Sequence, residues 1–407
     1  MTRDTTGATT GRAAVVGGSI GGLTAALLLR RLGWSVDVYE RTPVPLTNRG
    51  GGIVLQPETL RWFDQHGARR VEELATTTRR LRYLGPDDAV VHDEEVSWSF
   101  TSWSTIHGAL GADFGEERYH LGESLVGLDQ DADGVDLRFA SGRRERAQLV
   151  VLADGITSVG RRRLMPEVVP TYSGYVGWRG TVPESRLPAR VLDVTGDALT
   201  YGVGQQTHLV LYPIPGAEGR TAPRERLLNY VWYRNVAEGP ALDELMTDVR
   251  GIECPVSLHP GAVQPRFVEE MRAAATQLLA PTLAEVIHAT EQPFLQVVLD
   301  VRSPQVAHGR VALLGDAAFA ARPHAAAGSA KAADDAWALH DHLAAQPDDV
   351  PGALRAWEPG RLAVGNALLD RVRTMGERSQ VLGTWDPTDP ALRFGLREPA
   401  VAGLALH

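Results

Sequence analysis

Residues 15–23, Val15-Val16-Gly17-Gly18-Ser19-Ile20-Gly21-Gly22-Leu23, have the pattern of a strand end, a glycine turn and a helix start. A β-prone run begins at Ala13, the apolar helix pattern continues to Leu32, and a second strand pattern spans residues 36–40. This order predicts a strand–helix–strand unit whose turn approaches a dinucleotide. Glycines let the backbone come close to a pyrophosphate, and the helix N-terminus offers free N–H groups and a partial positive charge.

The turn has the pattern Gly-x-Ser-x-x-Gly, formed by Gly17, Ser19 and Gly22, with the serine in place of a middle glycine. Serine is small, but it carries a Cβ, so it is tolerated there. The second strand ends at Glu40, where a carboxylate accepts hydrogen bonds from ribose hydroxyls and disfavours a 2′-phosphate. An ordinary glycine turn in an α/β unit is the alternative. The strand, the helix and the acid together favour a dinucleotide other than NADP, and we predict cofactor contacts for these four residues and the adjacent Arg41.

Two aspartates follow apolar strand patterns elsewhere in the chain. Asp154 follows the run at residues 149–152 and precedes Gly155, while Asp316 follows Leu313-Leu314-Gly315. An aspartate at the end of a buried strand can accept charge-assisted hydrogen bonds from two sugar hydroxyls. Taken singly, Asp154 could be a turn residue and Asp316 a helix N-cap. With the glycine turn, they predict one cradle formed by three strand ends.

The remaining segments predict a second, β-rich unit. Residues 172–236 contain three strand-like segments rich in Tyr, Trp and Val, and helical patterns cover 266–291, 329–342 and 352–380. We therefore predict an α/β protein: a discontinuous Rossmann-like cofactor domain, an inserted β-sheet substrate domain and C-terminal helices. The predicted ranges are 11–75, 102–171 and 296–350 for the cofactor domain, 76–101 and 172–295 for the substrate domain, and 351–407 for the C-terminal helical segment and tail.

These motifs, in this order, resemble those of the class A flavin-dependent aromatic hydroxylases, the class of para-hydroxybenzoate hydroxylase, over nearly the whole chain. The Asp-Gly motif of the family is matched by Asp154-Gly155, and its Gly-Asp motif by Gly315-Asp316 with Pro323 and Gly328 after it. The resemblance implies that the dinucleotide is FAD and that Asp316 holds its ribityl chain. It also implies that Asp154 supports both FAD and the transient co-substrate, NADPH or NADH. The region of Pro323 and Gly328 would face the isoalloxazine ring.

Within this class the chain is similar to the branch that hydroxylates dihydroxypyridines, through residues 322–328 (Arg-Pro-His-Ala-Ala-Ala-Gly) and residues 235–251. Most of the class has Gly-Gln-Gly-x-Asn after the proline, a pattern that this chain lacks. The resemblance implies that NAD(P)H reduces FAD, that O2 forms a C4a-hydroperoxyflavin, and that its terminal oxygen goes to a hydroxypyridine or phenol ring. The alternatives are a natural-product tailoring hydroxylase acting on a larger hydroxypyridine or phenol, a flavoprotein that does not hydroxylate, and a binding protein without turnover.

Ionisation of the substrate ring sets a requirement for the site. A phenol titrates near 10, so ionising it at pH 7 takes about 4 kcal/mol, whereas one hydrogen bond to a charged group contributes about 1.5–3 kcal/mol. This comparison favours an acidic ring or a relay of two groups. In residues 206–212, period-2 alternation puts the even-numbered residues on the face opposite the apolar odd-numbered ones. We predict that the even face lines the active site, with His208 as base and Tyr212 as orienting group. Packing within the sheet is the alternative for both.

Other polar residues are assigned from their neighbours in the sequence. His324 directly follows Pro323, so we predict that it contacts substrate or flavin. For Trp178, Arg179, Tyr230 and Trp232, packing within the sheet is favoured over a place in the pocket. The Arg161–Arg163 run is predicted to be a solvated face, although Arg161 fits the family motif.

Composition excludes several classes of function. The chain has 407 residues, a net charge of −9 and one cysteine, Cys254. The negative charge argues against nucleic acid as a partner, and no apolar run reaches the roughly 18 residues of a membrane span. The polar first ten residues lack the apolar core of a signal peptide, and a single cysteine suits a reducing compartment, so a cytoplasmic location is expected. The scattered histidines predict no metal site. The expected partners are a small aromatic substrate and O2, and a homodimer stays open.

Overall fold

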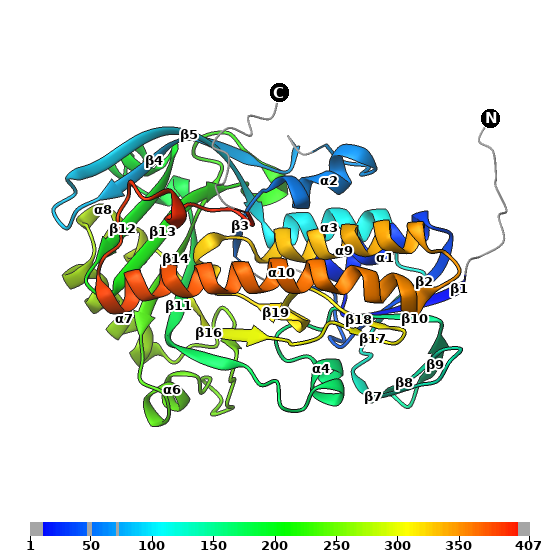
Figure 1. The fold of residues 1–407 in the computed structure, drawn as a ribbon. Coiled ribbons are helices and arrows are strands. Elements are labelled where there is room, and N and C mark those ends of the chain that lie inside the picture. Colours follow the sequence, from blue (N-terminus) through cyan, green and yellow to red (C-terminus); the bar gives the residue numbers. More distant parts are fainter. Residues whose placement is uncertain (1–10, 47–50, 71–72, 398–407) are drawn as a thin grey trace.

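The computed structural model describes residues 11–46, 51–70 and 73–397 (Figure 1). In this part of the chain the strands form a six-stranded, a ten-stranded and a three-stranded sheet. The polar start at residues 1–10 and the last part of the predicted tail, residues 398–407, lie outside the described residues. Figure 1 shows α10 (Val350–Glu377) running along one side of the molecule, where it contacts strands of both large sheets.

The six-stranded sheet contains the strands of all three predicted motifs. β1 lies between β2 and β10, and β18 lies next to β10, all of them parallel. All four residues of β10 are buried, as expected for a parallel strand covered on both faces. The carboxyl ends of parallel strands meet at one edge of a sheet, so the turns after β1, β10 and β18 come together. The predicted common sheet is therefore confirmed. In sheet order its strands are β17 (Ala307–His308), β18 (Val311–Leu313), β10 (Leu149–Leu152), β1 (Gly11–Val16), β2 (Trp34–Glu40) and β6 (Tyr119–Leu121).

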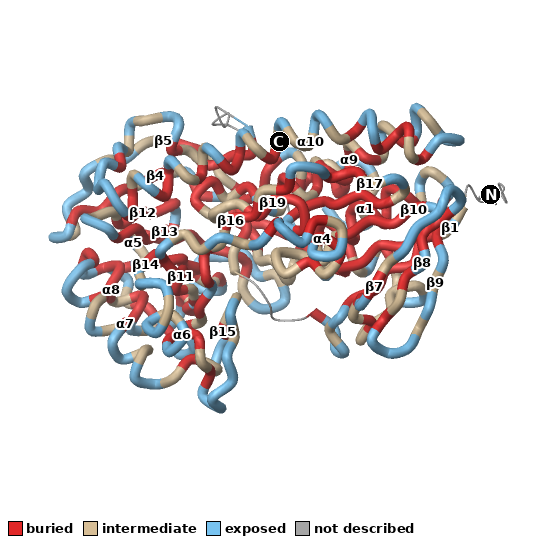
Figure 2. The backbone as a smooth tube through the Cα atoms, turned by 60° about the horizontal axis from the view of Figure 1, so that its bottom comes forward, coloured by how far each residue is buried: buried red, intermediate tan, exposed pale blue. Residues whose placement is uncertain are grey.

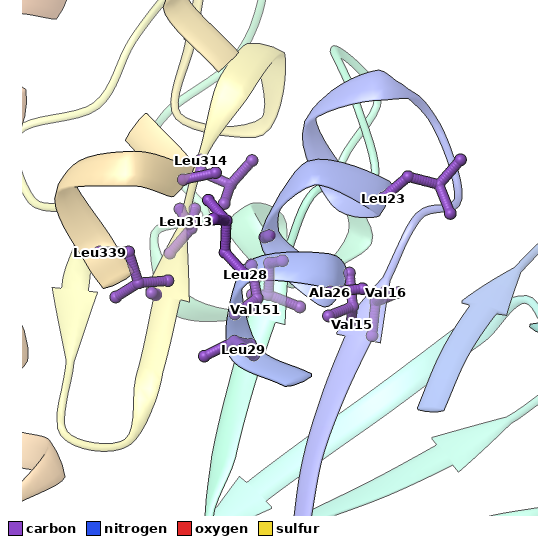
Figure 3. Close-up of a cluster of buried hydrophobic side chains, with 14 of the residues drawn as sticks. Val15, Val16, Leu23, Ala26, Leu28, Leu29, Val151, Leu313, Leu314 and Leu339 are labelled. Atoms are coloured by element: carbon purple, nitrogen blue, oxygen red, sulfur yellow. The ribbon is translucent and has the colours of Figure 1, made fainter. Parts of the chain in front are cut away.

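Helices pack against this sheet through small and apolar residues. Figure 3 shows apolar side chains of α1 and of the three motif strands in one cluster with Leu339 of α9. The helices α1 and α9 approach closely, because a Cβ on Gly21 would lie only 2.9 Å from the Cβ of Ala332. The helices of this part are α1 (Ile20–Arg31), α2 (Pro57–Gln65), α3 (Trp103–Phe114), α4 (Val159–Leu164) and α9 (Gly328–Ala345).

The ten-stranded sheet has the order β15-β16-β11-β14-β13-β12-β4-β5-β3, and β19 pairs with β16 outside this path. Its strands are β3 (Gly52–Val54), β4 (Thr76–Leu84), β5 (Val90–Ser102), β11 (Thr171–Pro183), β12 (Ala198–Gly204), β13 (Thr207–Ile214), β14 (Leu227–Asn235), β15 (Ser257–Leu258), β16 (Phe294–Arg302) and β19 (Phe319–Ala320). The third sheet is a meander of β7 (Leu125–Gln130), β8 (Val135–Phe139) and β9 (Arg144–Ala147).

Two secondary-structure predictions need correction. Within residues 172–236 there are four strands and α5 (Ala189–Thr195), not three strands. The additional strand, β12, contains two glycines, which weaken a strand pattern. The helical pattern at residues 266–291 is two helices, α7 (Pro265–Leu278) and α8 (Pro281–His288), because a proline at the first helical position starts a new helix. A further short helix, α6 (Pro240–Leu245), follows β14.

The predicted domain ranges stay a prediction, and the sheets cross two of them. β3 lies inside the range 11–75 and most of β16 inside 296–350, both predicted as cofactor domain, yet both strands belong to the ten-stranded sheet. The chain therefore passes between the two large sheets more often than the predicted ranges imply.

The two faces of the ten-stranded sheet bury different sets of residues. Val210 and Tyr212 pack in the cluster that includes side chains of α10, whereas Leu209 and Leu211 pack in the cluster that includes α7 and α8. The predicted alternation of residues 206–212 is confirmed. Figure 2 shows buried residues filling the interior around both large sheets. Within the described ranges, no helix combines the length and the apolar character that crossing a membrane requires.

Candidate active site

The three motif turns meet at one edge of the six-stranded sheet. The amide of Ala153 donates to the carbonyl oxygen of Val16 at 2.7 Å, and the amide of Leu314 donates to that of Leu152 at 3.0 Å. Gly17 has a φ of +105°, and a Cβ on it would lie 2.2 Å from the carbonyl oxygen of Ala153. This position therefore requires glycine both for its backbone conformation and for the contact between the first two turns.

Ser19 and Gly22 shape the start of α1. Ser19 occupies the N-cap position without a side-chain capping hydrogen bond. A Cβ on Gly22 would lie 1.9 Å from the carbonyl oxygen of Gly17, so the turn has no room for a larger residue there. The helix N-terminus thus begins directly at the glycine turn, as the phosphate-binding pattern predicts.

Glu40 lies at the end of β2, beside the glycine turn. Its Oε2 accepts the amide of Gly18 at 3.0 Å, and its Oε1 accepts the amide and the hydroxyl of Thr42 at 2.9 and 2.8 Å. A carboxylate has about four acceptor positions, so three internal bonds leave capacity for a ribose hydroxyl. The adjacent Arg41 donates through Nη1 to Oγ1 of Thr157 at 2.9 Å, which joins this end of the site to the second motif.

Asp154 has one oxygen fixed and one oxygen unused. Oδ2 accepts the amides of Val159 and Gly160 at 2.8 and 3.3 Å, at the start of α4. Oδ1 is buried and has no hydrogen-bond partner among the described residues. Burial raises the pKa of this carboxyl. An orphaned carboxylate oxygen in a cavity wall is the group expected where a ligand hydroxyl would donate.

A buried ion pair on α9 holds the backbone of the residue before Asp316. The sequence analysis did not identify this pair. Lys331 and Asp335, one turn apart on α9, pair at 2.7 Å and are both buried. Lys331 Nζ donates to the carbonyl oxygen of Gly315 at 2.9 Å, and Asp335 Oδ2 accepts the amide of Gly315 at 2.9 Å. The Asp316 side chain opens into the groove described below, but the surrounding protein limits its solvation, which raises the pKa of its carboxyl. The sequence could have indicated this ion pair, because a lysine and an aspartate stand four residues apart in an alanine-rich helical pattern.

Arg161 is buried, contrary to the predicted solvated face. Its Nη1 donates to the carbonyl oxygen of Ala317 at 3.0 Å, and its Nη2 donates to that of Ile156 at 2.5 Å. These carbonyls belong to the turns that carry Asp316 and Asp154. Arg161 therefore holds the second and third motifs together.

Three neighbouring cavities form a groove along these turns. The first, of about 250 Å³, is lined by Glu40, Arg41 and Asp154. The second, of about 410 Å³, shares Ser19 and Gly155 with the first. The third, of about 200 Å³, shares Asp316 and Gly328 with the second. Acids at two sugar positions and a helix N-terminus between them fit an extended dinucleotide such as FAD. Among the described residues, no three His, Cys, Asp or Glu side chains are grouped so as to hold a metal ion.

The third cavity, which we call the ring cavity, contains His324, Tyr212 and Pro323. Pro323 starts a short 3-10 helix, and α9 begins at Gly328. The structure thus brings two of the three predicted catalytic residues to the same cavity as the Pro323–Gly328 turn.

Only one of the two ring nitrogens of His324 has a hydrogen-bond partner among the described residues. Its Nε2 lies 2.8 Å from Oη of Tyr175, while its Nδ1 is buried without a hydrogen-bond partner among the described residues. Burial, with Arg322 and His208 nearby, keeps the pKa of His324 well below its usual range. Tyr175 Oη also accepts from Arg322 at 3.4 Å. Tyr175 comes from β11, so the pairing joins residues 149 positions apart, which no local pattern indicates.

His208 does not line the ring cavity. It is 1% exposed, and its ring packs among those of Tyr233, Trp385 and His324. Neither ring nitrogen has a hydrogen-bond partner within the described part of the chain. Burial lowers the pKa of His208 to about 3. The predicted base therefore lies next to the predicted contact residue, in an aromatic environment that holds it neutral.

Arg179 lines both the second cavity and the ring cavity, although packing within the sheet was predicted for it. It is a neighbour of Tyr212 in this wall, and its charge opposes the effect of burial, which raises the pKa of Tyr212 to about 12. Trp178, Tyr230 and Trp232 are buried in the sheet as predicted. The ring cavity thus combines one guanidinium, one neutral imidazole and two tyrosines, Tyr212 and Tyr233.

The comparisons with known proteins cover the same regions. Residues 172–300 match the family model described as FAD binding domain-like, and residues 15–69 match that of an NAD(P)-binding Rossmann-like domain. A 2,6-dihydroxypyridine 3-monooxygenase from Paenarthrobacter nicotinovorans is 44% identical over 400 residues, which cover 97% of this chain and 98% of that protein. A 6-hydroxynicotinate 3-monooxygenase from Bordetella bronchiseptica is 27% identical, covering 82% of this chain and 85% of that protein.

A solved structure has the same architecture. The structure of 2,6-dihydroxypyridine-3-hydroxylase from Arthrobacter nicotinovorans matches with a TM-score of 0.91 and 42% identity. The match covers 97% of this chain and 98% of that one, so it includes the six-stranded sheet, the ten-stranded sheet and the C-terminal helices.

Proposed function

The chain belongs to the FAD-dependent aromatic monooxygenases, and from this premise we propose that it hydroxylates a small, acidic hydroxypyridine with NADH or NADPH and O2. The predicted family, fold class and cofactor are confirmed by the 44% identity over nearly the full length of both chains. The observation that carries the substrate proposal is the ring cavity of about 200 Å³, in which Arg179, His324 and Tyr212 line a common wall.

FAD, when bound, supplies the redox and oxygen-transfer chemistry. Glu40, Asp154 and Asp316 would hold its sugar and ribityl hydroxyls, and the N-terminus of α1 its pyrophosphate. The glycine turn supports this assignment, since a Cβ on Gly17 or Gly22 would collide with the backbone of Ala153 or Gly17 and distort the turn. Arg41 would add a positive charge at the same end.

The residues of the ring cavity would bind and ionise the substrate. The unpartnered Nδ1 of His324 can accept the hydrogen bond of a ring hydroxyl, because the lowered pKa keeps this imidazole neutral. When the hydroxyl proton passes to Nδ1 of His324, Arg179 would stabilise the ring oxygen anion that forms. Because the pKa of Tyr212 is raised, its hydroxyl stays protonated and can orient a ring oxygen or nitrogen. His208 packs against His324 and does not line the cavity, so it is not the base.

Energetics favour an acidic ring. A hydrogen bond to a charged group contributes about 1.5–3 kcal/mol, less than the roughly 4 kcal/mol that ionises a simple phenol at pH 7. For a hydroxypyridine that is more acidic than phenol, the free energy of ionisation at pH 7 is smaller, so one charged hydrogen bond can supply it. A larger tailoring substrate is not favoured, because the cavity is small and aromatic side chains form part of its lining.

The experiment compares substrates on the purified, FAD-loaded protein. We expect 2,6-dihydroxypyridine to accelerate NAD(P)H oxidation by about tenfold or more over the rate without substrate, with equivalent O2 uptake and a hydroxylated product. Phenol should accelerate it much less. Equal stimulation by phenol would contradict the acidic-ring argument, and no stimulation by any hydroxypyridine would contradict the proposed function.

A further inference from the structure

The chain after α10 returns to the ring cavity. Residues 385–397, which we call the C-terminal strap, are drawn in red near the end of the described chain in Figure 1. The amide of Gly395 donates to the carbonyl oxygen of Ala325 at 2.9 Å, and the amide of Leu396 donates to Oε1 of Gln56 at 2.8 Å. The strap is thus bonded to the turn that carries His324.

Gln56 joins the strap and this turn through a single side chain. Its Nε2 donates to the carbonyl oxygen of Ala326 at 2.8 Å, and the residue is 3% exposed. Ala326 has a φ of +51°, a left-handed conformation that is unfavourable for an L-residue with a Cβ. The hydrogen bonds from Gln56 and Gly395 hold the backbone on both sides of this strained position.

Charged residues fix the strap from outside. Arg393 pairs with Glu94 of β5 at 2.5 Å, and Arg371 of α10 donates to the carbonyl oxygen of Gly395. The strap is therefore bonded to β5, to α10 and to Gln56, the residue that precedes α2. Attachment to three elements indicates a fixed wall of the cavity.

Phe394 is the point at which the strap reaches the ring cavity. It lines this cavity and is 4% exposed. Its ring packs edge-on against Trp98 at 5.8 Å between centroids and at a tilt against Tyr201 at 6.0 Å. Of the described strap residues, Phe394 is the one in the cavity lining.

We propose that the C-terminal strap is a fixed wall of the ring cavity, in which Phe394 limits the acceptor to a single ring and Gln56 couples the wall to the Pro323–Gly328 turn. This inference rests on the proposed function and adds its specificity-determining residue. A two-ring hydroxyquinoline would overlap with the phenyl group, which neighbouring aromatic rings prevent from turning away. Removing that group enlarges the ring cavity, because Phe394 is part of its lining.

The test compares a one-ring with a two-ring acceptor. In Phe394→Ala, the kcat/KM for 2-hydroxyquinoline relative to 2,6-dihydroxypyridine should rise by about tenfold or more, and in Phe394→Leu by less, since pocket discrimination by apolar bulk is of this size. Binding of each ring, measured by perturbation of the flavin absorbance, should change in the same order. An unchanged ratio in folded, FAD-loaded Phe394→Ala would overturn the proposal.

Leu396→Ala is the matched control. Leu396 belongs to the same strap and is 6% exposed, but it does not line the ring cavity. This variant should unfold at a lower urea concentration, as expected for truncation of a buried leucine, and keep the wild-type substrate ratio. If it shifted the ratio as much as Phe394→Ala, loosening of the strap and not the phenyl group would be responsible, and the proposal would be wrong.

The coupling through Gln56 has a readout independent of turnover. In Gln56→Leu, amide hydrogen exchange at Gly395 and Leu396 should accelerate by about tenfold or more, because loss of about 1.4 kcal/mol in local stability corresponds to tenfold. Unchanged protection would exclude the coupling. The two proposals fail differently: a wild-type protein that hydroxylates neither ring contradicts the function, whereas equal binding of both rings to the wild-type protein contradicts the wall.

Discussion

Lys331 and Asp335 form a buried ion pair, 2.7 Å between Nζ and Oδ2, that holds both backbone polar groups of Gly315. The pair lies on α9 and fixes the turn that carries Asp316. A second cation, Arg361, lies 3.6 Å from Oδ1 of Asp335, so the carboxylate is partly compensated without Lys331. The position of the third motif thus depends on a helix that follows it in the sequence.

Lys331→Met should weaken both folding and FAD binding. Breaking a buried pair costs about 3–5 kcal/mol, and the nearby Arg361 places the expected loss of unfolding free energy at the lower end, about 3 kcal/mol. Urea denaturation and FAD titration measure the two effects. The control is Arg355→Ala, which breaks an exposed pair at 3.9 Å and should cost less than about 1 kcal/mol. Equal effects of the two variants would contradict the role of the buried pair.

Gly17→Ala should abolish stable FAD binding. The added Cβ would lie 2.2 Å from the carbonyl oxygen of Ala153, so the first two motif turns must move apart. Gly108→Ala in α3 is the matched substitution, because a Cβ there meets no atom within 4 Å. It should raise the unfolding free energy by about 0.5–1 kcal/mol, the helix-propensity gain of alanine over glycine, and leave FAD affinity unchanged. Tight FAD binding by Gly17→Ala would contradict the geometry of the cradle.

His208 should make the protein less stable in acid. Burial lowers its pKa to about 3, whereas an unfolded chain binds the proton near pH 6.5. Between these values the unfolded state binds more protons, so stability falls as the pH decreases below about 6.5 and stops falling near 3. His324, with its lowered pKa, contributes in the same direction.

His208→Leu removes one of these groups. Between pH 6.5 and 4.5 the variant should lose about 2–3 kcal/mol less unfolding free energy than the wild type, at about 1.4 kcal/mol per pKa unit. No hydrogen bond to the described residues is lost, because neither ring nitrogen has one. Denaturation at the two pH values tests this, and parallel losses in both proteins would show that His208 is not held neutral.

Tyr175→Phe should slow turnover without loosening the fold. It removes the 2.8 Å partner of His324 Nε2 and keeps the aromatic ring, so kcat should fall by about tenfold while FAD affinity stays unchanged. Tyr172→Phe is the control on the same strand, because its hydroxyl donates to the carbonyl oxygen of Val236 and does not contact His324. Its kcat should stay within about twofold of wild type. A Tyr175→Phe enzyme with wild-type kcat and pH profile would exclude a role for the hydroxyl.

The cofactor groove could be predicted because its residues follow parallel strands. Gly17, Asp154 and Asp316 each come directly after a buried strand, and the carboxyl ends of such strands meet at one edge. The alternation in residues 206–212 likewise predicted which face of β13 turns to the cavity, although His208 lies beside His324 and not in the cavity wall.

The rest of the site could not be predicted, because it depends on contacts between distant segments. Tyr175 reaches His324 across 149 positions, and Gln56 reaches Leu396 across 340. Phe394 lies in the range predicted only as a C-terminal helical segment and tail, and its position follows from the hydrogen bond of the adjacent Gly395 to the Pro323–Gly328 turn. No periodicity marks such residues, since each has its role only in the assembled structure.

The most direct measurement of the central account is the origin of the product oxygen. FAD-loaded protein, NAD(P)H and 2,6-dihydroxypyridine are incubated with isotopically labelled O2 in ordinary water, and the product is analysed by mass spectrometry. The account predicts a hydroxylated ring that carries the heavy isotope. A product whose new oxygen comes from water, or a purified protein that does not bind FAD, would contradict it.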